Sequence, residues 1–155
     1  MRNKKIEEKA ILVSACLLGL ACRYNAKAKP CERMVEMANK GVRLIPVCPE
    51  QMGGLPTPRP ACEMVGGTGA DVLQGRARVM NKEGEDCTQA FLHGAQEVLT
   101  LAGLYAVEEA WLMARSPSCG EGRVYDGTFS RRLIAGDGVC AALLKQNGIV
   151  VLNEE

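Results

Sequence analysis

The stretch Ala10-Ile11-Leu12-Val13-Ser14-Ala15-Cys16 decides the fold. It is a continuous apolar run of strand length, and such runs are typical of strands buried on both faces of a parallel sheet. Similar runs occupy residues 42–48, 110–114 and 149–152. We therefore expect four buried strands. Because proline lacks a backbone N–H, the second strand is expected to stop pairing near Pro46, just before Cys48.

Helical patterns separate these runs. Residues 30–41 begin with a proline, repeat apolar positions at i, i+3 and i+4, and stop at Gly41. A longer helix is expected from Asp86 or Thr88 to residue 102, and a short one over residues 139–146, whereas residues 61–85 favour a hairpin outside the main sheet. This alternation predicts a single α/β domain over residues 1–155. The expected architecture is three-layer and Rossmann-like, a mostly parallel sheet of about four to five strands with helices on both faces.

The composition excludes several classes of protein. With a net charge of +1 and 4% aromatic residues, the chain has neither a general attraction for nucleic acid or membrane nor a stacking platform for long single strands. No run approaches the roughly 20 apolar residues of a membrane span. The N-terminus is a charged lead-in over residues 1–9, expected to fray, and Glu7 and Glu8 argue against a signal peptide. We expect a cytoplasmic protein without a membrane partner.

Eight cysteines in such a chain indicate metal binding or catalysis more than disulfides. Three of them follow three successive strand patterns: Cys16, Cys48 and Cys119. Because the carboxyl ends of parallel strands meet at one edge of a sheet, where ligands bind, these thiols are expected to converge. Cys22 lies close enough along the chain to approach the same site, and its part is left open. The remaining cysteines are interpreted as small buried hydrophobes or free thiols: Cys31, Cys62, Cys87 and Cys140.

The segment 46–60, Pro-Val-Cys-Pro-Glu-Gln-Met-Gly-Gly-Leu-Pro-Thr-Pro-Arg-Pro, surrounds the second of these cysteines. Its prolines and glycine pair predict a stiff, shaped loop that holds Cys48 and Glu50 two residues apart. An ordinary proline-rich turn is the plainer interpretation.

Three converging thiolates suit a soft metal centre. A structural zinc site takes four ligands, and a 4Fe-4S cluster usually takes four cysteines, so three cysteines would leave one iron open for catalysis. A cysteine hydrolase is the competing hypothesis. It needs a base such as histidine, and the single histidine, His93, lies within the long helix, away from the strand ends.

Several motifs together resemble the bacterial thiouracil desulfidase family over about residues 11–152: Ser14-Ala15-Cys16-Leu17-Leu18-Gly19, Cys22-Arg23-Tyr24, Cys48-Pro49-Glu50, Gly53-Gly54-Leu55, Pro58-Arg59, Ser116-Pro117-Ser118-Cys119-Gly120 and Tyr125-Asp126-Gly127-Thr128-Phe129. The resemblance implies a 4Fe-4S cluster held by Cys16, Cys48 and Cys119. It also implies removal of sulfur, as sulfide, from a small thiolated pyrimidine or from thiolated RNA. One departure is Tyr24-Asn25-Ala26, where family members often have Tyr-Asp-Gly.

The expected reaction is a hydrolysis without net redox change. The thiocarbonyl sulfur binds the open iron, water attacks the ring carbon, and Glu50 is the candidate base. Ser116 is the second catalytic candidate. Substrate-binding candidates are Tyr24, Arg59, Ser118 and Phe129, although turn capping, loop bracing and core packing are the plainer roles of these side chains. The alternative function is a non-catalytic nucleobase- or metal-binding module that uses the same three thiols.

Overall fold

The computed structural model describes residues 9–154; the rest of the charged lead-in, residues 1–8, and residue 155 lie outside the described part. The main sheet has four parallel strands in the order β2-β1-β5-β8, with β1 (Ile11–Ser14) and β5 (Glu109–Leu112) in the centre. β2 (Leu44–Val47) and β8 (Val150–Asn153) form its edges. The predicted α/β class and parallel sheet are confirmed.

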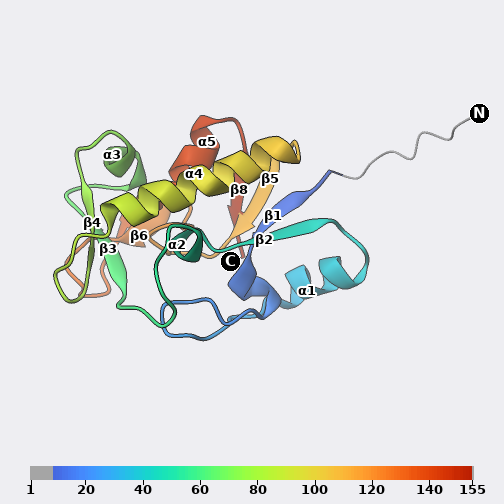
Figure 1. Cartoon of the computed structure of the whole chain (residues 1–155), viewed down its shortest axis with the longest axis horizontal. Coiled ribbons are helices and arrows are strands. Elements are labelled where there is room, and N and C mark those ends of the chain that lie inside the picture. The colour runs from blue at the N-terminus through green and yellow to red at the C-terminus, as the bar shows by residue number, and fades with distance from the viewer. Residues whose placement is uncertain (1–8, 155) are drawn as a thin grey trace, which may run out of the picture.

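Helices cover both faces of this sheet (Figure 1). Alternate residues of β1 show the division, because Leu12 packs in a core with side chains of α4 (Thr88–Leu104) and α5 (Val139–Gln146). Its neighbour Val13 packs on the other face with residues of η1 (Ala15–Leu18) and α1 (Glu32–Asn39). This two-sided burial explains why β1 is apolar at successive positions.

The second strand stops pairing one residue after Pro46, directly before Cys48, close to the predicted end. Pro46 is paired with Val13, and β2 ends at Val47. Proline is tolerated here because β2 lies at the edge of the sheet, where one side of the strand needs no donor. Cys48 follows at once.

The expected hairpin outside the main sheet is present as β3 (Cys62–Val65) and β4 (Arg78–Asn81), which pair antiparallel. Several short elements were not predicted. A short helix, α2 (Pro49–Met52), replaces part of the proline-rich loop, and Pro49 at its first position has the φ that a helix requires. Others are α3 (Gly69–Leu73) and the hairpin β6 (Arg123–Tyr125) with β7 (Leu133–Ala135).

Across residues 9–154, no helix combines the length and the apolar character that crossing a membrane requires.

Candidate functional site at the carboxyl edge of the sheet

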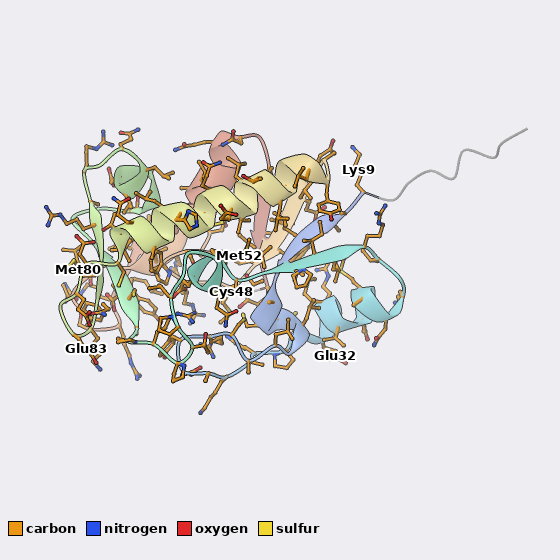
Figure 2. All side chains as sticks on the ribbon, viewed as in Figure 1. Lys9, Glu32, Cys48, Met52, Met80 and Glu83 are labelled. Atoms are coloured by element: carbon orange, nitrogen blue, oxygen red, sulfur yellow. The ribbon has the colours of Figure 1, made fainter. Side chains whose placement is uncertain are left out.

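The three predicted cysteines do converge. Cys16 lies in η1 directly after β1, Cys48 caps the start of α2 after β2, and Cys119 lies in the loop after β5. All three line one cavity of about 690 Å³, within the size range of small-molecule sites. Figure 2 shows Cys48 near the middle of the molecule, close to Met52 at the other end of α2. The same cavity is lined by the other sequence-predicted site residues: Tyr24, Glu50, Arg59, Ser116, Ser118 and Phe129.

The surroundings of Cys22, Cys48 and Cys119 favour the protonated thiols in the metal-free protein. Burial raises the pKa of Cys119 to about 12. A hydrogen bond with Cys22, together with burial, raises the pKa of Cys48, and a hydrogen bond with Cys16 raises the pKa of Cys22. Neutral thiols are poor nucleophiles, and a bound metal must displace their protons.

This chemistry disfavours the cysteine-hydrolase hypothesis. His93 lies on α4 with its side chain 61% exposed and contacts Glu97 at 3.9 Å. It is not among the residues that line the cavity. The site therefore lacks the histidine that would generate a thiolate nucleophile.

The donor set fits an iron–sulfur group better than a single ion. In the described part of the chain, no three His, Cys, Asp or Glu side chains are grouped so that they could hold a metal ion. A four-iron cluster requires a different arrangement, because each thiolate binds its own iron. Soft thiol donors on three separate segments around a cavity, two of them buried and one half-buried, suit that arrangement.

Glu50 is held by contacts at both carboxylate oxygens. Arg59 Nε donates to its Oε1 at 3.1 Å, and Ser118 Oγ donates to its Oε2 at 3.1 Å. The Glu50 side chain is 14% exposed and the Arg59 side chain 4%. The second contact joins residues 68 positions apart in sequence, so the carboxylate of α2 is fixed to the loop that carries Cys119.

Arg59 braces the loops around the cavity. Its Nη1 donates to the carbonyl of Pro56 and to Thr57 Oγ1, and its Nη2 donates to the carbonyl of Cys22 at 3.0 Å. That same carbonyl accepts from the Cys48 thiol at 3.7 Å. One buried guanidinium thus connects Glu50 with the loop that carries Cys22. Of the two roles considered for Arg59, the geometry favours bracing.

The two serines form a directed chain of hydroxyl groups. Ser116 Oγ accepts from the backbone N–H groups of Ser118 and Cys119 at 3.2 and 3.1 Å. Its own proton is left for Ser118 Oγ, 3.0 Å away, because the Ser118 proton goes to Glu50. Protons can therefore pass from Ser116 through Ser118 to Glu50. Ser118 Oγ also lies 3.6 Å from the thiol of Cys119.

The departure from the family pattern at residues 24–26 has a visible consequence. Ala26 adopts a φ of 59°, a left-handed conformation that glycine accepts more readily. Asn25 takes over a role that an aspartate could fill, since its Oδ1 accepts from the N–H of Lys27 at 3.1 Å. The loop keeps Tyr24 on the cavity, 42% exposed, with the Arg23 guanidinium 5.9 Å from its ring centre.

Two supports of the site were missed from the sequence. Ser14 Oγ accepts from the N–H of Met113 at 2.8 Å and also contacts Cys119, so it joins β1 to the loop after β5. Gly53 and Gly94 let α2 approach α4 closely, since a Cβ at Gly53 would lie 2.0 Å from the carbonyl oxygen of Ala90. The sequence offered one indication of this contact: Gly94 lies inside a long helical pattern, and a glycine at such a position often has a packing reason.

Comparisons with known proteins agree with this geometry. The family described as 2-thiouracil desulfurase matches residues 11–155. The uncharacterized protein YbbK of Bacillus subtilis (strain 168) is 44% identical over 144 residues, which are 93% of this chain and 95% of YbbK. The solved structure of the [4Fe-4S]-dependent thiouracil desulfidase TudS superposes with a TM-score of 0.82 at 38% identity, over 94% of this chain and 91% of that chain.

Proposed function

Because this chain belongs to the 2-thiouracil desulfurase family, we propose that it is a thiouracil desulfidase that depends on a 4Fe-4S cluster. One observation carries the proposal: three thiols from three strand ends, two buried and one half-buried, line the same cavity as the Glu50–Ser118 pair. A module that only stored metal would not need a hydrogen-bonded carboxylate beside its thiols. The reaction replaces the thiocarbonyl sulfur by oxygen from one water and releases hydrogen sulfide, with no exchange of electrons.

Cys16, Cys48 and Cys119 are the residues that would hold the cluster. When bound, the cluster would supply an iron with a free coordination position, a Lewis acid that can polarise a thiocarbonyl group. Cys22 has a thiol beside two of these ligands, and we assign it to the wall of the site rather than to the ligand set.

The proton chemistry falls to Glu50 and the serines. A general base must lie within hydrogen-bond reach of the water that it activates, and Glu50 lines the cavity with its carboxylate held in place by Arg59. The chain from Ser116 through Ser118 ends on this carboxylate and supplies a second route for protons. In this proposal Arg59 is a positioning residue, and Ser116 and Ser118 orient water or substrate.

The substrate that we propose is a small thiolated pyrimidine. Tyr24 and Phe129 line the cavity and offer aromatic faces to a planar ring. Thiolated RNA is the second candidate, and basic side chains that line the cavity support it: Arg23, Lys29, Lys82 and Arg131. Desulfuration of free thiouracil measured against a short thiolated RNA at equal concentration separates the two.

Anaerobic purification followed by iron, sulfide and turnover analysis tests the proposal. We expect about four irons and four sulfides per chain, a brown protein, and release of hydrosulfide from 2- or 4-thiouracil with formation of uracil. A colourless, zinc-containing protein that remains inactive after anaerobic reconstitution with iron and sulfide would instead establish the non-catalytic binding module.

A further inference from the structure

Glu63 is a buried anion bound by the backbone of a distant loop. It lies in β3 opposite Met80, is 9% exposed, and lines the cavity. Its Oε1 accepts from the N–H groups of Gly127 at 3.0 Å and Phe129 at 3.1 Å. Closely spaced backbone N–H groups that face one anion form a concave binding site known as a nest. Because burying a carboxylate is unfavourable without such bonds, this contact attaches residues 126–131 to β3.

The attached backbone has a conformation that needs support. Gly127 has a φ of 91° and Phe129 a φ of 57°, so both N–H groups that bind Glu63 belong to residues in the left-handed region. A phenylalanine occupies that region only where its surroundings hold it there. Gly127 also lies directly on β3, since a Cβ there would be 2.4 Å from the carbonyl oxygen of Met64. The glycine contact fixes where the loop lies, and Glu63 stabilises the shape of its backbone.

This loop forms one wall of the cavity. Phe129 is half-buried and lines the cavity together with Glu63 and Tyr125. The position of its ring follows from the backbone at residue 129, because a change of φ there would redirect the side chain. An aromatic face is a surface on which a planar heterocycle stacks.

We propose that Glu63 is a positioning residue: its carboxylate holds the backbone of Gly127 and Phe129 so that the Phe129 ring forms the wall on which the planar substrate stacks. The contact between the Glu63 carboxylate and the loop backbone is given directly by the two hydrogen bonds. The identity of the stacked ligand rests on the proposed function.

Hydrogen exchange in the cluster-loaded, full-length protein tests the contact. Glu63→Ala should speed exchange of the Gly127 and Phe129 amides by about tenfold or more, since each loses a bond to a charged acceptor. The β8 amides should keep their rates. Glu63→Gln, which retains an acceptor oxygen, should recover much of the protection. Glu83→Ala is the matched control, because Glu83 is an exposed glutamate in the turn that follows β4 (Figure 2). Unchanged exchange at both amides in Glu63→Ala would overturn the proposal.

Substrate affinity tests the role. Glu63→Ala and Phe129→Ala should each raise the KM for thiouracil and the dissociation constant of the unreactive product uracil by about tenfold, the usual effect of a lost stacking contact. The double variant should be no worse than Phe129→Ala alone, because Glu63 acts through that ring. Iron content and kcat should stay close to those of the parent.

A double variant whose effects add, or a Glu63→Ala protein that loses kcat instead of affinity, would show that Glu63 acts by another route. Failure of the proposed function looks different: the unaltered protein would neither bind uracil nor turn over thiouracil. Exchange of the two loop amides in Glu63→Ala would still report on the Glu63 contact.

Discussion

The carbonyl oxygen of Pro49 occupies the place where a side chain on Gly94 would have to go: a Cβ at Gly94 would lie 1.8 Å from that oxygen. α2 therefore lies directly on the backbone of α4, and Glu50, one residue after Pro49, is carried on the part of α2 that makes this contact. The position of the candidate base depends on a glycine that lies 44 residues away and does not line the cavity.

Gly94→Ala should destabilise the protein and displace Glu50. Overpacking typically costs about 1–3 kcal/mol, and backbone cannot yield as a flexible side chain can, so we expect about 3 kcal/mol or more. Gly103→Ala in the same helix is the control, because nothing lies within 4 Å of its Cβ position. That substitution should stabilise by up to about 1 kcal/mol through helix propensity. Urea unfolding of both variants gives the two free energies, and equal values would contradict the contact.

Glu50→Gln should preserve the cluster and lose turnover. The amide keeps the shape of the carboxylate but cannot accept a proton, so kcat for sulfide release should fall by about a hundredfold or more. Iron content and the visible spectrum of the variant should match those of the parent. Glu97→Gln on the exposed side of α4 provides the matched control. Unchanged turnover in Glu50→Gln would remove this residue from the mechanism.

Serine substitutions should divide the cysteines into two groups. Replacing Cys16, Cys48 or Cys119 should abolish retention of the roughly four irons expected for the cluster. Cys22→Ser should retain them, although its thiol contacts two of the ligands. Cys140→Ala supplies the control, since Cys140 is fully buried in α5 and does not line the cavity. Iron loss in Cys22→Ser together with iron retention in Cys119→Ser would reassign the third ligand.

Ala26→Gly should stabilise the protein by about 0.5–1 kcal/mol, because glycine removes the left-handed penalty at a smaller cost in chain entropy. Ala106 has a φ of 50° and lies beyond the end of α4, so Ala106→Gly tests the same backbone effect away from the cavity. Thermal unfolding should show a similar gain in both variants. If only Ala106→Gly gains stability, the φ of residue 26 is not a source of strain.

The iron-free protein should lose stability as the pH rises above 9. The pKa of Cys119 is raised from 9.0 to about 12 in the folded state, so the folded thiol keeps its proton where the unfolded chain releases it. The stabilisation is fully present below pH 9, and its loss is complete above the folded pKa of about 12. The expected slope for this thiol is about 1.4 kcal/mol per pH unit.

Urea unfolding between pH 8 and 10, under reducing and anaerobic conditions, measures this slope. Cys119→Ser removes the titrating group and should make the decline shallower. An identical slope in the variant would show that the Cys119 thiol is not protected from ionisation in the folded state.

Part of the site could be read from the sequence because the fold constrains it strongly. Strands separated by helices form a parallel sheet, and the carboxyl ends of parallel strands meet at one edge. That rule brought Cys16, Cys48 and Cys119 together across gaps that match no local metal motif. The sequence also predicted the stiff segment that carries Cys48 and Glu50, although the structure has a short helix there, Pro49–Met52, where a loop was expected.

The contacts and elements that hold the site residues in place could not be predicted from the sequence in this way. The hairpin of β6 and β7 is formed by strands of only 3 residues each, which are too short to show a periodic hydrophobic pattern. Glu63 accepts hydrogen bonds from backbone N–H groups of the loop at residues 127–129. Every residue except proline has such a group, so the residue types in the sequence do not indicate these bonds.

By itself, the sequence determined the order of the four main strands and the long segments between them, the edge at which three thiols meet, and the resemblance to the desulfidase family. It could do so because hydrophobic periodicity identifies the strands and helices, and their order along the chain indicates how the parallel sheet is assembled. Only the tertiary structure decided that Ser118 binds Glu50 across 68 residues, that Arg59 braces two loops, and that Gly94 sets the position of α2. These relationships depend on interatomic distances that must hold to within a few tenths of an ångström, and the packing of the folded chain sets such distances.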